Sequence, residues 1–242
     1  MKLLDLTLAT PPENLACDEV LLDIAEAGHG GEVLRFWEAV GHFVVVGYSN
    51  KVATEVNTAA CEANGIPILR RCTGGGTVLQ GPGCLNYSLV LMISDDRPLH
   101  SIASANKFIM EQNRAAIQSA VDDPRLPIRV EGHTDLTIGG RKFSGNSQRR
   151  QKQFLLYHGT FLLDFDLTLV SELLPLPSKQ PEYRKNRSHS DFLVNLGIAA
   201  DTVKTALVRT WNATGNADVI PMTQISKLAA DKYGNRDWNF KF

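Results

Sequence analysis

Three consecutive glycines, Gly74, Gly75 and Gly76, place the strongest constraint on what this chain can fold into. Glycine inside a helix or strand costs roughly 0.5–1 kcal/mol relative to alanine, so a run of three marks a break in regular structure. The run lies between two apolar segments, 66–69 and 77–79, and this predicts a strand–loop–strand element. Two interpretations of the loop remain open: a plain turn, or a surface of bare amide groups that lies against a ligand.

Two arginines, Arg70 and Arg71, come just before the glycine loop and favour the second interpretation. Guanidinium groups beside exposed backbone N–H groups suit a phosphate or a carboxylate. The sequence therefore predicts an anion-binding loop.

A second unusual segment spans residues 135–148. Its Gly139-Gly140 pair is a strong hairpin signal. The hairpin would carry Asp135 on one arm and Lys142 on the other, both within reach of one site. A positioned ammonium group can neutralise the charge that develops during acyl or phosphoryl transfer. The alternative is a solvated basic hairpin.

His158 and the cysteines give weaker signals. A histidine in an apolar strand-like segment such as 154–163 is either a packed core residue or part of a pocket. The cysteines show no CxxC pair and no zinc spacing, which predicts free thiols in a reducing cytoplasm and no protein metal site. They are Cys17, Cys61, Cys72 and Cys84.

Length and charge set outer limits. A chain of 242 residues suits one large domain or two small ones, and we interpret the polar segment 175–190 as a surface loop of a single domain, 1–242. The formal charge of -1 gives no electrostatic reason to expect a nucleic-acid partner. No apolar stretch is long enough to span a membrane.

The expected helices and strands are mixed without strict βαβ alternation, which favours an α+β architecture with a mixed or antiparallel sheet. A helix should run from Pro11 to the glycines at 28–31, with others at 52–64, 101–121, 167–174, 199–212 and 223–233. Strands are expected at 3–8, 33–38, 43–47, 86–92, 128–130, 135–138, 142–147 and 154–163, with a short turn joining 33–38 to 43–47.

Taken together, these segments resemble the lipoate–protein ligase A family of the biotin/lipoate ligase superfamily. Each motif is weak alone, but the ordered set is specific and covers nearly the whole chain. The matching segments are 14–19, the early pair 34–37 and 44–47 (a hairpin by resemblance), 70–78, 135–148, 158–162 and 232–239.

The resemblance implies an α+β, biotin/lipoate ligase-like catalytic domain with a large mixed sheet flanked by helices and a smaller sheet, and without the C-terminal accessory domain of the long ligases. It implies a cytoplasmic enzyme that joins lipoate to ATP, accompanied by Mg²⁺, and passes the lipoyl group from lipoyl-AMP to a lysine of a lipoyl domain. Implied acceptors are the E2 component of 2-oxoacid dehydrogenases and the glycine-cleavage H protein. A separate small accessory protein is a further implied partner.

The resemblance also assigns site residues. Lys142 would be the catalytic residue, contacting the phosphate and carbonyl oxygens of the intermediate. The implied ATP and lipoyl-adenylate site comprises Arg70, Arg71, Gly74, Gly75, Gly76, Thr77, Val78, Leu79, Asp135, Lys142, Ser144 and Gly145.

One segment departs from the family pattern. After the glycine loop the family usually has a His-Asp pair followed by Gly-Asn, whereas this chain has Gln80 and Gly81, then Pro82-Gly83-Cys84. Gly-Pro-Gly resembles the related octanoyltransferases. An acyltransferase that works from acyl carrier protein through a Cys84 thioester is therefore an alternative, although a cysteine nucleophile needs a depressed pKa and a nearby base. A further alternative is a non-catalytic binder of an acyl adenylate or a biotin-like ligand.

Overall fold

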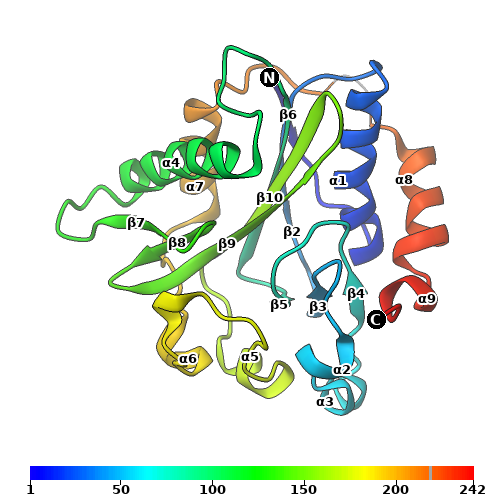
Figure 1. The fold of residues 1–242 in the computed structure, drawn as a ribbon, viewed down its shortest axis with the longest axis vertical. Helices are drawn as coiled ribbons and strands as arrows, with labels where there is room; N and C mark the ends of the chain where they lie inside the picture. The colour runs from blue at the N-terminus through cyan, green and yellow to red at the C-terminus, as the bar shows by residue number, and fades with distance from the viewer. Residues whose placement is uncertain (218–219) are drawn as a thin grey trace.

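A seven-stranded mixed sheet forms the centre of the molecule (Figure 1). The computed structural model describes residues 1–217 and 220–242. Only β1 and β2 pair in parallel; the other neighbours are antiparallel. In spatial order the strands are β1 (Lys2–Asp5), β2 (Val33–Glu38), β6 (Cys84–Met92), β10 (Phe154–Leu162), β9 (Arg141–Arg150), β8 (Asp135–Ile138) and β7 (Ile128–Glu131).

Helices cover both faces of this sheet (Figure 1). Helices α4 (Ile102–Val121) and α7 (Ala200–Thr210) pack on one face around the larger hydrophobic cluster. Helices α1 (Pro11–Glu26) and α8 (Met222–Leu228) pack on the other. Because successive side chains of a strand point to opposite faces, the long strands β6 and β10 supply apolar residues to both clusters. The predicted α+β class, with a large mixed sheet and a smaller one, is confirmed.

The smaller sheet carries the glycine loop. Strand β3 (Phe43–Val46) lies between β4 (Ile68–Arg70) and β5 (Val78–Gln80), parallel to the first and antiparallel to the second. The expected hairpin between 33–38 and 43–47 is therefore wrong, because β2 and β3 belong to different sheets. The turn between them carries the chain from the large sheet to the small one.

The other predicted elements are close to those observed, with three corrections. The expected helix 52–64 is two short helices, α2 (Val52–Glu55) and α3 (Thr58–Ala63), because the Asn57 side chain caps the second one. The segment 175–190, expected to be a loop, contains a 3₁₀ turn, η1 (Glu182–Arg184), and the start of α6 (His189–Phe192). The expected last helix ends in a π-helical turn, η2 (Ala229–Tyr233), and is followed by α9 (Arg236–Asn239). Helix α5 (Thr168–Leu173) is as expected.

Within the described residues, no helix combines the length and apolar character needed to cross a bilayer. All four cysteines are free and buried.

Candidate functional site

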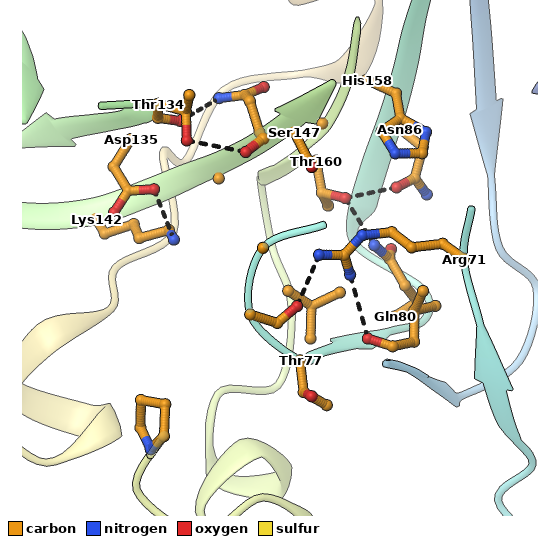
Figure 2. Close-up of a pocket in the computed structure, with 18 of the residues that line it drawn as sticks. Arg71, Thr77, Gln80, Asn86, Thr134, Asp135, Lys142, Ser147, His158 and Thr160 are labelled. Carbon is orange, nitrogen blue, oxygen red and sulfur yellow. Dashed lines mark hydrogen bonds and ion pairs between the residues drawn. The ribbon is translucent and has the colours of Figure 1, made fainter. Parts of the chain in front are cut away.

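A cavity of about 300 Å³ lies between the α1-covered face of the large sheet and the small sheet with its glycine loop. Side chains of β2, β6, β9 and β10 form its floor, and residues of α1, β3 and β5 form its walls. Figure 2 shows that its polar side chains come from both sheets and point toward one another. Two segments far apart in the sequence, the glycine loop and the β8–β9 hairpin, therefore border one site.

Lys142 reaches this cavity because of a β-bulge. The register of β8 against β9 shifts between Leu136 and Thr137, so that Phe143 is the extra residue of β9. A bulge re-aims the side chains beyond it, and here it brings Lys142 to the same face of the sheet as Gly145. The Lys142 ammonium lies 2.8 Å from Asp135 Oδ1, as the sequence predicted for the two arms of the hairpin (Figure 2).

Gly145 leaves room for this lysine. A Cβ atom added at Gly145 would lie 2.6 Å from Lys142 Nζ, closer than real contacts allow. On the outer side, the Tyr183 hydroxyl donates to Asp135 Oδ2 at 2.7 Å. Asp135 therefore accepts from Lys142 through one oxygen and from Tyr183 through the other, which fixes the lysine at the edge of the cavity.

Arg71 is enclosed by the glycine loop that follows it. Its guanidinium donates to the carbonyl oxygens of Gly74 and Gly76 and to the Thr73 hydroxyl. Gly75, at φ +85°, makes this curl possible, because a Cβ atom there would lie 2.9 Å from Arg71 Nη2. Burial lowers the pKa of Arg71 to about 10. In the described part of the chain no carboxylate pairs with it, so a buried positive charge borders the cavity without a counter-ion.

Arg70 points the other way. Its guanidinium donates to backbone carbonyl oxygens on the far side of β4, at Gly47, Tyr48, Asn50, Trp238 and Asn239. It is fully buried and does not line the cavity. The structure thus separates two arginines that the sequence placed in one site.

The other predicted site residues divide in the same way. Those lining the cavity, besides Arg71, are Gly75, Gly76, Thr77, Val78, Asp135, Lys142, Gly145 and His158. Those outside the lining, besides Arg70, are Gly74, Leu79, Ser144 and Cys84.

Cys84 lies at the start of β6, 1% exposed, in the hydrophobic cluster beneath the small sheet. Burial raises the pKa of its thiol to about 12. A nucleophilic cysteine needs the opposite shift and access to its substrate. The setting of Cys84 is that of a buried structural thiol.

His158 belongs to a buried polar chain on the cavity wall. Asp18 Oδ1 accepts from Arg35 at 2.6 Å, and Asp18 Oδ2 lies 3.1 Å from His158 Nδ1. His158 Nε2 in turn lies 2.7 Å from the Thr73 hydroxyl in the glycine loop. Burial alone would raise the pKa of Asp18, but Arg35 and His158 hold it below its usual value. This series of hydrogen bonds links the Asp18–Arg35 ion pair to the glycine loop that surrounds Arg71.

Several lining residues escaped prediction as site residues because their local sequence is ordinary. Asp18 and Trp37 lie in an amphipathic helix and a buried strand, and only the fold brings them together. Segment 177–192 adds Lys179, which is exposed, and Arg184, which is buried, to the lining. Their segment was predicted only as a polar surface loop, and no sequence signal marked either residue as part of the site.

The fold and the cavity together define a class. A large mixed sheet, a small sheet with a glycine loop, and a lysine on a bulged hairpin facing that loop form a biotin/lipoate ligase-like catalytic domain. Residues 10–210 match the model of the lipoyl protein ligase A/B catalytic domain, and the chain belongs to that family.

Similar proteins include both ligases and transferases. The chain is 28% identical to lipoate-protein ligase A subunit 1 of Thermoplasma acidophilum, over 97% of this chain and 95% of that protein. It is 26% identical to octanoyltransferase LipM of Geobacillus kaustophilus, over 99% of this chain and 98% of that protein. A T. acidophilum putative lipoate protein ligase solved with bound lipoic acid superposes with a TM-score of 0.80 at 25% identity, covering 99% of this chain and 98% of that one. The structure of a lipoate-protein ligase A bound with ATP superposes with a TM-score of 0.79 at 26% identity, covering 99% of this chain and 98% of that one.

Proposed function

We propose that the protein activates lipoate with ATP to lipoyl-AMP and transfers the lipoyl group to a lysine of a lipoyl domain. One observation carries the proposal: two positively charged groups, Lys142 and Arg71, border one cavity, and the described lining contains no cysteine. Such a site stabilises negative charge and offers no thiol for a covalent acyl-enzyme. This favours a non-covalent acyl-adenylate route.

The chemistry requires mainly positioning and charge stabilisation. A lipoate carboxylate oxygen attacks the α-phosphorus of ATP, and pyrophosphate leaves. The amine of the acceptor lysine then attacks the acyl carbonyl carbon, AMP leaves with the C–O bond pair, and the amine proton is released. In both steps we assign Lys142 the role of neutralising the phosphate and carbonyl oxygens. The side chains of Leu15, Val45 and Val78 offer apolar walls for the acyl chain.

Nucleotide binding draws on the mouth of the cavity. Lys179 and Arg184 line the cavity together with Lys142 and Arg71, and this positive charge suits the phosphates of ATP. The described residues hold no group of three His, Cys, Asp or Glu side chains suited to a metal ion. Mg²⁺ would therefore enter as part of the Mg–ATP complex, held mainly by the phosphates.

The acceptor follows from the relatives. The T. acidophilum enzyme is described as a bi-partite lipoate protein ligase with its E2 lipoyl domain, and its subunit 1 matches this chain over nearly its full length. We extend both features to this protein: a lipoyl domain of an E2 component as acceptor, and a separate accessory protein as partner. The family resemblance alone supports two further proposals: the glycine-cleavage H protein as a second acceptor, and a role of the accessory protein in adenylation. Free, buried cysteines agree with a cytoplasmic setting.

Octanoyl transfer is the second candidate, because LipM octanoyltransferases match nearly the whole chain at comparable identity. In this cavity the reaction would be direct: the acceptor amine attacks the octanoyl thioester of acyl carrier protein, and the carrier thiolate leaves. The buried position of Cys84 gives no support to a thioester on that residue.

One assay separates the two candidates. The pure protein is mixed with an apo lipoyl domain, and the mass of that domain is followed by mass spectrometry. Modification from lipoate plus Mg–ATP, or from preformed lipoyl-AMP if adenylation needs the accessory protein, supports the ligase. Modification from octanoyl acyl carrier protein alone supports the transferase instead. If no donor modifies the domain, both proposals are wrong.

Two variants test the site. Lys142→Ala should lower transfer by about 10²–10³-fold, the usual effect of removing one group that stabilises a developing oxyanion. Lys152→Ala is the matched control, because Lys152 is exposed and outside the cavity, and it should transfer at the wild-type rate. Wild-type turnover by Lys142→Ala would contradict the assignment.

A further inference from the structure

A line of four neighbouring residues crosses the cavity floor. Strand pairing places Trp37 opposite Asn86, Asn86 opposite Thr160, and Thr160 opposite Gly145. All four line the cavity. The line starts at Gly145, beside the Lys142 ammonium, and ends at Trp37 on the opposite side of the floor.

The length of this line matches a medium acyl chain. Adjacent strands lie about 4.8 Å apart, so Asn86 is roughly 10 Å and Trp37 roughly 14 Å from Gly145 across the sheet. An extended chain advances roughly 1.2 Å per bond, so an eight-carbon chain spans roughly 9 Å. With its carbonyl group at Lys142, such a chain would bring its distal end to Asn86, with Trp37 on the next strand beyond it.

Three polar atoms at this distal end have no hydrogen-bond partner. Within residues 1–217 and 220–242, none is found for the Trp37 indole Nε1, Asn86 Nδ2 or Gln80 Oε1. The three side chains are 3–4% exposed. Buried polar atoms without partners are uncommon in folded proteins, because burial removes their water. Two donors and one acceptor are therefore available to a ligand.

Thr160 orients this group. Gln80 Nε2 donates to the Thr160 hydroxyl at 2.6 Å, and that hydroxyl donates to Asn86 Oδ1 at 2.6 Å (Figure 2). A threonine hydroxyl has a single proton to donate, so the hydrogen bonds run in one direction. In the orientation observed, the free end of Gln80 is its acceptor Oε1 and the free end of Asn86 is its donor Nδ2. The reverse direction would also leave one donor and one acceptor at these two ends.

The next line of residues across the floor behaves differently. It contains Arg35 and His158, and Asp18 from α1 contacts both. Two atoms of this line, Arg35 Nε and Ser88 Oγ, also lack a partner, but they belong to residues outside the cavity lining. Among the described residues, only Trp37, Asn86 and Gln80 combine a buried side-chain atom that lacks a partner with a place in the cavity lining.

We propose that Trp37, Asn86 and Gln80 form a subsite for a hydrogen-bonding group at the distal end of the acyl substrate. Besides lipoate, whose ring sulfurs are only weak acceptors, the subsite admits a medium-chain acyl group that ends in an oxygen function. That group would accept from the two N–H donors and donate to Gln80, and a hydroxyl is the simplest example. The subsite discriminates against an unsubstituted alkyl chain, whose methyl end leaves all three atoms unsatisfied. The inference rests on the proposed function, because it requires the carboxyl end of the substrate to lie at Lys142.

Calorimetric binding of free acids to the wild-type protein tests the proposal. We expect ω-hydroxyoctanoate to bind at least about tenfold more tightly than octanoate. Because the comparison uses the wild-type protein, it holds even if a variant fails to fold. Octanoate and ω-hydroxyoctanoate binding with equal affinity would overturn the subsite and leave the proposed function standing. If lipoate, octanoate and ω-hydroxyoctanoate all fail to bind, the acyl pocket, and with it the proposed function, is wrong.

Variants locate the preference. Asn86→Leu and Gln80→Leu should each bring the ratio of the two dissociation constants close to one, with octanoate bound at least as well as by the wild type. Ser147→Ala is the matched control: Ser147 also lines the cavity, but its hydroxyl donates to Gly74 O, at 2.9 Å. It should change both affinities alike and keep the ratio. An unchanged ratio in both leucine variants would overturn the assignment of these residues.

Discussion

Arg70 and Arg71 are neighbours in sequence and opposites in structure. Both are buried, and both guanidinium groups are surrounded by carbonyl oxygens rather than carboxylates. Arg70 binds the backbone at the ends of β3 and α9, on the side away from the cavity. Arg71 binds the glycine loop on the cavity side. One residue joins distant parts of the scaffold, and the other shapes the site.

The difference comes from the alternation of a strand. Successive side chains point to opposite faces, so two adjacent arginines at the end of β4 cannot share one pocket. Because both residues are arginines, the sequence suggested one common site for them. In the structure only Arg71 fits the predicted anion site. The comparison predicts that replacing Arg70 lowers mainly the stability of the protein, whereas replacing Arg71 lowers mainly its affinity for the ligand.

Arg70→Met should have the largest effect on stability. It removes the guanidinium donor from five buried or part-buried carbonyl oxygens and weakens the attachment of α9 to β4. We expect a loss of roughly 4–5 kcal/mol in the free energy of unfolding. Denaturant unfolding measures this value. Arg129→Met, at an exposed position on β7, is the control and should stay within about 0.5 kcal/mol of the wild type. A loss for Arg70→Met below about 1 kcal/mol would contradict the scaffold role.

Asp18→Asn should have the next largest effect, and it depends on pH. It removes the carboxylate that pairs with buried Arg35, which costs about 3 kcal/mol at neutral pH. The pKa of Asp18 is lowered in the folded state, so its stabilisation is present above the unfolded pKa of about 3.9 and is lost as pH falls through the folded value.

The wild type should therefore lose stability below about pH 4, and Asp18→Asn should lose less over the same range. Urea unfolding between neutral and acid pH measures how the free energy of unfolding changes with pH in the wild type and in Asp18→Asn. The pKa of Glu19 is also lowered, so part of the dependence of stability on pH remains in Asp18→Asn. Asp23→Asn, at an exposed position on the same helix, is the control at neutral pH and should stay within about 0.5 kcal/mol of the wild type. Parallel profiles for Asp18→Asn and the wild type would count against the Asp18–Arg35–His158 chain.

Much of the fold followed from the sequence, for identifiable reasons. Long helices with apolar periodicity, such as 102–121, and glycine-marked turns, such as Gly139-Gly140, carry local signals that survive into the structure. The hairpin of 33–38 with 43–47 was wrong because strand pairing is a long-range choice. No local pattern shows that a turn leads from one sheet to another.

The candidate site was predictable only in part. The glycine loop and the 135–148 hairpin were recognised, and their contact with one cavity agrees with the sequence. The bulge at Phe143, which brings Lys142 beside Gly145, has no sequence marker of its own. The floor residues Trp37 and Asn86 come from different strands, and their proximity is a product of the sheet order. Residue type indicated the chemistry, but register decided which side chains carry it.

Arg71→Met should affect binding more than stability, in contrast to Arg70→Met. The loop carbonyls it leaves lie at a cavity that water can enter, so we expect a loss of only about 1–2 kcal/mol in unfolding free energy. Affinity for a non-hydrolysable lipoyl-adenylate analogue should fall at least about tenfold, because a positive charge without a counter-ion is lost beside the ligand. Calorimetry on the folded variant measures this. If Arg71→Met unfolds as readily as Arg70→Met while its affinity is unchanged, the division between scaffold and site is wrong.

Cys84→Ala should have the smallest effect. It tests whether Cys84, in the segment where the sequence departs from the family pattern, belongs to the scaffold or to the site. The thiol packs in an apolar cluster with its pKa raised, so its removal should cost about 1 kcal/mol, as for a small buried apolar group. Transfer to the lipoyl domain should continue at the wild-type rate from every donor that works, because no step passes through this sulfur. Mass spectrometry of the protein after incubation with octanoyl acyl carrier protein should show no octanoyl adduct on Cys84. An adduct, together with loss of transfer in Cys84→Ala, would move Cys84 from scaffold to site and require the small sheet to open during the reaction.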